Sequence, residues 1–255
     1  MSTKMTKKFI VANWKMNPLS LKEAESLFLS INKKIFFKKN EVVICPPYIY
    51  MDKLKKISKK IYLGAQDAFW GDTGAFTGEI STEMLSSLGV KYVILGHSER
   101  RELGETNFSI NKKLKSSLSS GMIPILCVGD KERDKNHEYF SFVRKQLEEC
   151  LNGIKKEFLC KLIIAYEPVW ALSTTKDRRD ATSEDSKEMN IFIKKIIASK
   201  FGINVKMPKI IYGGSVNEKN VEDFLVNGNV DGVLIGGASL KLEKFLEIVR
   251  IAEKI

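Results

Sequence analysis

The stretch IIAYEPVWAL, Ile163 to Leu172, begins as an apolar run and then places a single carboxylate, Glu167, before Pro-Val-Trp. An apolar run without polar alternation is typical of a strand buried on both faces of a parallel sheet. The small and charged residues that follow have the composition of a loop. The stretch therefore predicts a buried strand with a carboxylate at its carboxyl end.

Runs of the same kind recur along the chain, and helical patterns with apolar residues at three-to-four spacing lie between them. Eight strands that alternate with helices over 255 residues favour a closed (β/α)8 barrel over an open doubly wound sheet. We expect one α/β domain over residues 1–255, since no change in composition and no linker divides the chain. The expected strands are Phe9–Asn13, Glu41–Cys45, Ile61–Ala65, Tyr92–Leu95, Pro124–Val128, Leu162–Tyr166, Lys209–Tyr212 and Gly232–Ile235, and the main helices are expected near 21–35, 110–118, 140–151, 189–197, 221–226 and 242–252.

The composition is that of a soluble globular protein, with 44% apolar and 29% charged residues. Its formal charge of +11 raises nucleic acid, membranes and acidic substrates as partners. Because the lysine pairs are scattered over helical segments, they indicate solvated helix faces and argue against a nucleic-acid or membrane surface. These pairs are Lys33-Lys34, Lys55-Lys56, Lys112-Lys113, Lys155-Lys156 and Lys194-Lys195.

The four cysteines, Cys45, Cys127, Cys150 and Cys160, show neither C-x-x-C spacing nor the density of a disulfide scaffold. We therefore expect reduced thiols. The basic N-terminal stretch lacks the apolar segment of a signal peptide, and no apolar run in the sequence is long enough to cross a membrane. A cytoplasmic protein is expected.

Polar side chains follow three of the expected strands. Asn13 and Lys15 follow the first strand, His97 and Glu99 follow the fourth, and Glu167 follows the sixth. In a (β/α)8 barrel the loops after the carboxyl ends of the strands build the active site, so these side chains are expected to meet at one edge. Lys15 is expected to fix a substrate oxygen or a phosphate as a point charge, with a plain surface lysine as the alternative.

His97 in isolation suits a hydrogen-bonded core residue as well as a functional group. It stands directly before the tripeptide SER, which begins a short helix, and a helix N-terminus disfavours the imidazolium. We therefore expect a neutral ring that acts as a hydrogen-bonding electrophile. The other histidine, His137, lies in a polar run, and neither histidine has clustered ligands, so no metal site is predicted.

Adjacent glycines follow the seventh and eighth expected strands, Gly213-Gly214 in YGGSV and Gly236-Gly237 in IGGASL. Loops after these two strands are a frequent phosphate site in barrels, often at a helix N-terminus. Glycines also serve tight turns, which is the alternative here. Two such pairs on neighbouring strand ends, beside Ser215 and Ser239, favour a phosphate cradle. The sequence contains neither a nucleoside triphosphate motif nor a dinucleotide motif.

A carboxylate opposite a neutral histidine, a lysine and a phosphate cradle suits proton transfer beside a carbonyl group. Nucleophilic hydrolysis has no Ser-His-Asp pattern to support it, and Cys127 lies within the fifth expected strand. Proton shuttling is therefore the predicted chemistry.

Five motifs, NWKMN, GHSERR, AYEPVWA, YGGSV and GGASL, together resemble those of the triosephosphate isomerase family. They occur in the family's order, and the similarity covers essentially the whole chain. The resemblance implies a single (β/α)8 TIM barrel that interconverts dihydroxyacetone phosphate and D-glyceraldehyde 3-phosphate through an enediolate, in glycolysis and gluconeogenesis. It also implies an isomerase that needs no cofactor and no metal.

The places of three residues in these motifs imply catalytic roles. Glu167 would be the base that moves the carbon-bound proton, His97 would polarise the carbonyl and pass protons between the oxygens, and Lys15 would stabilise negative charge. The residues that the resemblance places around the substrate are Asn13, Lys15, Ser173, Ser215, Gly236 and Gly237.

The chain departs from the family pattern at two places. After GHSERR it is one residue shorter than many members, which leaves open the partner of Glu105, an expected structural carboxylate. The loop after AYEPVWA, which is a lid in the family, lacks glycines and carries an apparent insertion at Asp177–Asp180. Within it we expect Arg178 and Arg179 to be solvated and paired to their own aspartates, with contact to the phosphate as the alternative.

Phe76 stands on the glycine-rich stretch WGDTGAFTGEI, an unusual exposure for an aromatic side chain unless a partner covers it. A loop folded onto its own barrel is the alternative. The corresponding loop of the family docks into a partner subunit, which favours a homodimer.

Two other functions compete with this interpretation. One is a different phosphate-binding barrel isomerase with a bulkier phosphoribosyl substrate. The other is a barrel without chemistry that serves as a scaffold or a basic nucleic-acid binder. The second should lack at least one of Lys15, His97 and Glu167, and all three are present.

Overall fold

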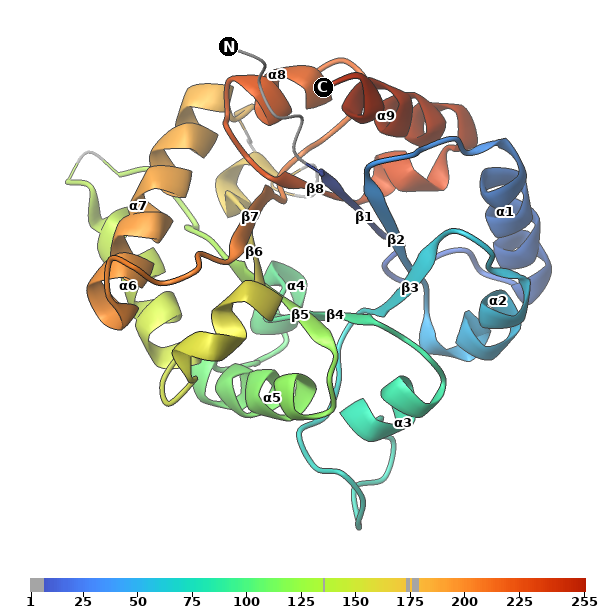
Figure 1. Ribbon diagram of the computed structural model, residues 1–255, viewed down its shortest axis with the longest axis horizontal. Helices are drawn as coiled ribbons and strands as arrows, with labels where there is room; N and C mark the ends of the chain where they lie inside the picture. The colour runs from blue at the N-terminus through green and yellow to red at the C-terminus, as the bar shows by residue number, and fades with distance from the viewer. Residues whose placement is uncertain (1–6, 135, 173–174, 176–178) are drawn as a thin grey trace.

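The computed structural model describes residues 7–134, 136–172, 175 and 179–255. Eight parallel strands form a closed barrel in chain order, with β8 hydrogen-bonded back to β1. Figure 1 shows the strands at the centre and the helices in a ring around them. The predicted (β/α)8 barrel is therefore confirmed. The strands are β1 (Phe9–Asn13), β2 (Glu41–Cys45), β3 (Tyr62–Ala65), β4 (Tyr92–Leu95), β5 (Ile123–Val128), β6 (Ile163–Tyr166), β7 (Lys209–Tyr212) and β8 (Gly232–Ile235).

The helices cover the outside of the barrel. The longer ones are α1 (Leu21–Lys34), α5 (Asn107–Ser119), α6 (Glu138–Cys150), α7 (Ser183–Phe201) and α9 (Leu242–Lys254). The shorter ones are α2 (Met51–Ile57), α3 (Thr82–Ser87), α4 (Ser98–Glu102) and α8 (Val221–Val226), and 3-10 turns occur at η1 (Tyr48–Tyr50), η2 (Lys156–Lys161), η3 (Val169–Ala171) and η4 (Gly237–Leu240).

Most boundaries follow the apolar pattern, and the differences have local causes. The helices α2 and α3, which the sequence did not predict, have 7 and 6 residues, too few for a three-to-four spacing to repeat. β5 begins one residue earlier than predicted, because the Ile123 N–H donates to the Lys91 carbonyl across 2.8 Å. β3 and β6 begin one residue later, at Tyr62 and Ile163.

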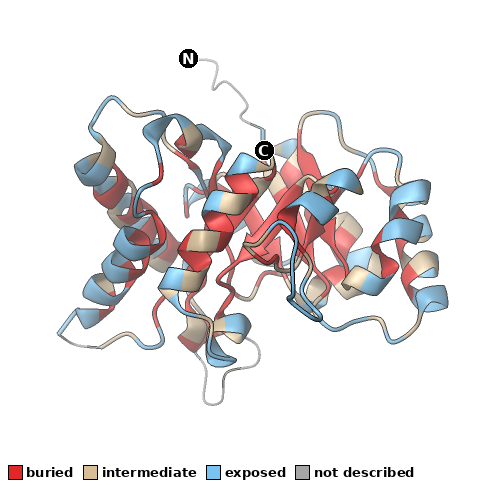
Figure 2. Cartoon of the chain, turned by 90° about the horizontal axis from the view of Figure 1, so that it is seen from below, coloured by how far each residue is buried: buried red, intermediate tan, exposed pale blue. Residues whose placement is uncertain are grey.

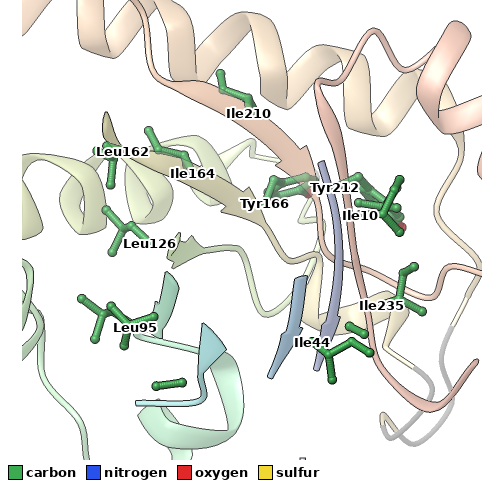
Figure 3. Packing of buried hydrophobic residues seen from close by; sticks show 14 of the residues in the cluster. Ile10, Ile44, Leu95, Leu126, Leu162, Ile164, Tyr166, Ile210, Tyr212 and Ile235 are labelled. Carbon is green, nitrogen blue, oxygen red and sulfur yellow. The ribbon is translucent and has the colours of Figure 1, made fainter. Parts of the chain in front are cut away.

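The core has two layers because successive strand residues point to opposite faces of the sheet. One set fills the barrel interior, and it includes Val11, Val43, Ile94, Ile125 and Ile211. The other set faces the helices, and it includes Ile10, Ile44, Leu126, Ile164, Ile210 and Ile235, which Figure 3 shows in place. In Figure 2 the buried residues accordingly occupy the strands and the inner faces of the helices. Burial on both faces explains why the strand sequences are continuously apolar.

Glu105, whose partner the sequence left open, contacts the Nζ of Lys113. The same Nζ lies 2.8 Å from both carboxylate oxygens of Asp67, and Arg100 lies 2.9 Å from Asp67 Oδ2. Lys113 is only 5% exposed, so its charge is held almost wholly by these carboxylates. The cluster ties α5 to the loops after β3 and β4, next to the edge where the predicted site residues lie.

Candidate functional site

A cavity of about 380 Å³ opens at the carboxyl ends of the strands. It contains most of the site residues that the sequence predicted, brought together from the ends of β1, β4, β7 and β8. None of the described residues that line it is acidic, so it suits an anion. The lining residues are Asn13, Lys15, His97, Leu172, Gly213, Gly214, Ser215, Val216, Asn217, Leu234, Gly236, Gly237, Ala238, Lys241 and Lys244.

Lys15 is held in a left-handed backbone conformation, with φ of 53°. A non-glycine residue at such a φ costs about 1 to 2 kcal/mol, and it persists only where the surroundings fix it. Here the Lys15 N–H donates to Asn13 Oδ1 across 3.0 Å, and Gln66 Nε2 donates to the Lys15 carbonyl across 2.8 Å. The Lys15 Nζ lies 2.6 Å from Glu99 Oε1. These contacts direct the ammonium group into the cavity. Gly236 lies beside the lysine side chain, since a Cβ built at Gly236 would lie 3.4 Å from Lys15 Cε.

His97 caps the N-terminus of α4, as the sequence predicted. The Glu99 N–H donates to His97 Nδ1 across 3.2 Å, so this nitrogen acts as an acceptor. In a neutral imidazole the proton then lies on Nε2, which is the atom that faces the site. His97 Nε2 lies 3.1 Å from Glu167 Oε1. The helix start thus sets the ring for donation from Nε2.

Glu167 directly follows β6, and its own N–H donates to the Val128 carbonyl across 2.8 Å. Its carboxylate accepts the Ser98 N–H across 3.0 Å, and the residue is 2% exposed. Gly213 leaves room for it, since a Cβ there would lie 2.9 Å from Glu167 Cγ. Glu167 does not line the cavity in this arrangement. To contact a ligand in the cavity, the carboxylate would have to leave the Ser98 N–H.

Asp130 contacts residues on both sides of Glu167, a role that the sequence analysis missed. Its carbonyl accepts the Val169 N–H across 2.9 Å, and its carboxylate accepts the Tyr166 hydroxyl across 2.7 Å and the Trp170 indole N–H across 2.9 Å. Burial raises the pKa of the Asp130 carboxyl, against the opposing effect of these donors and of a nearby arginine. Its position just past β5 was the available signal, since it is another carboxylate at a strand end.

The glycine pairs after β7 and β8, which were predicted to form a phosphate cradle, both line the cavity. Ser215 lies at its wall, and its Oγ donates to the Ala171 carbonyl across 2.9 Å. Ser239 is fully buried and donates to the Gly236 carbonyl across 2.7 Å, so it supports the turn and does not line the cavity. Lys241 and Lys244, which the sequence analysis did not single out, add positive charge to the wall. Ser173 lies outside the described residues.

Cys127 has no features of a nucleophile. It is fully buried in β5, and burial, together with the nearby Glu167, raises the pKa of its thiol well above the usual value. Within the described ranges of the chain, no group of three or more His, Cys, Asp or Glu side chains could hold a metal ion.

Comparison with known proteins agrees with this geometry. The sequence pattern of the triosephosphate isomerase family matches residues 8–252. The triosephosphate isomerase of Dictyoglomus thermophilum is 45% identical over 257 residues, covering 96% of this chain and 100% of the relative. Those of Alkaliphilus oremlandii and Caldanaerobacter subterraneus are 40% and 41% identical over 251 residues, with 96% of this chain and 99% of each relative covered. The (β/α)8 barrel and a match over nearly its entire length together show that this chain belongs to the triosephosphate isomerase family.

Proposed function

We propose that Glu167, His97 and Lys15 carry out the triose-phosphate isomerisation from which the family takes its name. The substrate pair is dihydroxyacetone phosphate and D-glyceraldehyde 3-phosphate, and the reaction belongs to glycolysis and gluconeogenesis. The observation that supports these roles is the convergence of a carboxylate, an Nε2-protonated imidazole and an ammonium group beside a glycine-walled cavity without acidic lining. No cofactor enters the proposed reaction.

The cavity orients the substrate before any proton moves. Backbone N–H groups of Gly236 and Gly237 and the side chain of Ser215 bind the phosphate, at the point where η4 begins in the cavity wall. Lys15 and Asn13 then bind the oxygens at the other end of the substrate. Fixing the phosphate in this way holds the reacting carbons in one geometry, which is a large part of the barrier reduction available to an enzyme.

In the proposed reaction Glu167 takes a proton from carbon 1 of dihydroxyacetone phosphate. The electron pair forms the C1–C2 double bond, and negative charge moves to the oxygen on carbon 2. The Nε2–H of His97 and the ammonium group of Lys15 stabilise this charge as it develops. His97 gives its proton to this oxygen and takes one from the oxygen on carbon 1. Glu167 returns its proton to carbon 2, which completes D-glyceraldehyde 3-phosphate.

The direct test is turnover of D-glyceraldehyde 3-phosphate by the purified protein, coupled to reduction of dihydroxyacetone phosphate with NADH. We expect saturable turnover that inorganic phosphate inhibits competitively, because phosphate occupies the same cradle. A phosphoribosyl aldose serves as the comparison substrate and should not react. If the folded protein turned over the phosphoribosyl substrate but not D-glyceraldehyde 3-phosphate, the result would favour the alternative isomerase.

We propose that the protein acts in the cytoplasm, where triose phosphates are metabolised. Among the helices of the described chain, none combines the length and apolar character needed to span a membrane.

We also propose that the chain is a homodimer. The apolar residues Met16, Ile49, Phe76 and Leu103 are exposed on the segments after β1, β2, β3 and β4, which are neighbours in the barrel. In Figure 1 the segment between β3 and α3 projects well beyond the ring of helices. Phe76 packs on Phe69 within the chain, with ring centroids 4.6 Å apart, yet stays half exposed. Exposed apolar groups gathered on one side are typical of a protein interface.

Replacing Phe76 by serine should weaken this dimer, because a half-exposed aromatic side chain on a projecting segment would be covered by the partner. We expect the dissociation constant to rise at least about tenfold, measured by sedimentation over a range of protein concentrations. Phe36→Ser is the control, since Phe36 is also exposed but lies after α1, away from this surface. A fully active wild-type monomer at all concentrations would contradict the proposal.

A further inference from the structure

The segment after Glu167 carries an arginine that the proposed reaction does not use. The guanidinium carbon of Arg179 lies 4.3 Å from the centroid of the Trp170 ring, within the range of a cation–π contact. Arg179 is exposed, as the sequence predicted, but its contact with Trp170 was not predicted. Arg178 lies outside the described residues. Trp170 lies in the short 3-10 turn η3 and is only 7% exposed. Arg179 is thus one of the side chains that cover this ring.

The ring that Arg179 covers is fixed at its other end. The indole N–H of Trp170 donates to Asp130 Oδ2, and Asp130 also binds Tyr166 and Val169, the residues on either side of Glu167-Pro168. A second guanidinium, that of Arg133, lies 3.2 Å from Asp130 Oδ2 and 5.7 Å from the Trp170 ring centroid. The position of the Trp170 ring is therefore linked, through Asp130, to the turn that carries the proposed base.

We propose that Arg179 is a positioning residue, which holds Trp170 against Asp130 and so fixes the turn that presents Glu167. This inference rests on the proposed function, because the importance of the turn follows from the role of Glu167. An arginine suits the task, since its planar charge stacks on an indole face.

The first test compares steady-state kinetics of Arg179→Ser, Arg179→Lys and wild type with D-glyceraldehyde 3-phosphate. An exposed cation–π contact of ordinary strength predicts a three- to fivefold loss of kcat for Arg179→Ser, with KM changed less than twofold. Arg179→Lys keeps the cation and should recover at least half of the lost kcat. The control is Arg144→Ser, which removes an equally charged residue from a surface ring contact, 5.6 Å from the Phe192 centroid, and should change neither parameter. An unchanged kcat in Arg179→Ser overturns the proposal.

A double-mutant cycle shows whether the effect passes through the ring. In a Trp170→Leu background the additional change Arg179→Ser should lower kcat by less than 1.5-fold, because the contact is already lost. If the additional change costs the same three- to fivefold there, Arg179 acts by another route and the proposal is wrong.

A readout without catalysis separates this inference from the proposed function. Arg179→Ser should increase acrylamide quenching of Trp170 fluorescence, with Trp170→Phe used to subtract the signals of Trp14 and Trp70. Unchanged quenching would refute the contact even in a fully active enzyme. Wild-type protein without isomerase activity would refute the proposed function while this measurement still tests the contact.

Discussion

Glu167→Gln is expected to lower kcat for the isomerisation by at least ~100-fold, the lower range for loss of a positioned general base. The amide has nearly the shape of the carboxylate, and it can still accept the Ser98 N–H that now lies 3.0 Å from Glu167 Oε2. It cannot take a proton from carbon. Binding should change less than turnover, because in the proposed site other residues bind the phosphate, so the loss should appear in kcat more than in KM.

The measurement is the coupled assay, and circular dichroism checks that the mutant is folded. Glu222→Gln is the matched control, because Glu222 is exposed on α8 and the same chemical change there should leave turnover within twofold of wild type. Glu167→Gln that keeps more than a tenth of wild-type kcat would show that another group is the base.

The second large effect concerns stability. Lys113→Met should lower the free energy of unfolding by ~3–5 kcal/mol, because it leaves buried carboxylates without their cation. The side chains of Lys113, Glu105 and Asp67 are 6%, 4% and 14% exposed, so water cannot replace the missing charge. Arg100 stays 2.9 Å from Asp67, but the structure shows no comparable second cation for Glu105 among the described residues.

Urea denaturation at one fixed protein concentration measures this loss. Lys115→Met on the same helix is the control, since Lys115 is exposed and a surface substitution there should change the free energy of unfolding by less than about 0.5 kcal/mol. A loss below about 1 kcal/mol for Lys113→Met would mean that Glu105 and Asp67 find other partners or become neutral without strain.

The barrel and most of the candidate site could be predicted because both depend on local sequence. A continuously apolar run predicts a strand buried on both faces, and the residue just past it then has to lie at the carboxyl edge of the sheet. This logic identified Lys15, His97 and Glu167, and the structure brings them together at that edge. It also placed Gly236 and Gly237 in the wall of the cavity.

Partners that join distant positions could not be predicted, because no local period encodes them. Glu167 pairs with the Ser98 amide across 69 positions, and Lys113 pairs with Asp67 across 46. The same reason hid the contacts of Asp130 with Tyr166 and Trp170, which are 36 and 40 positions away.

The sequence by itself determined which segments form strands, which strand ends carry polar groups and which family the motifs resemble, because these properties follow from patterns along the chain. The tertiary structure alone decided where each polar side chain points. In the folded chain Glu167 accepts the Ser98 N–H and does not line the cavity, and Ser239 donates to the Gly236 carbonyl. Arg179 contacts the Trp170 ring. The physical reason is that burial, hydrogen bonding and ring contacts depend on which atoms the closed barrel brings within a few ångströms, and closure is a property of all eight strands together.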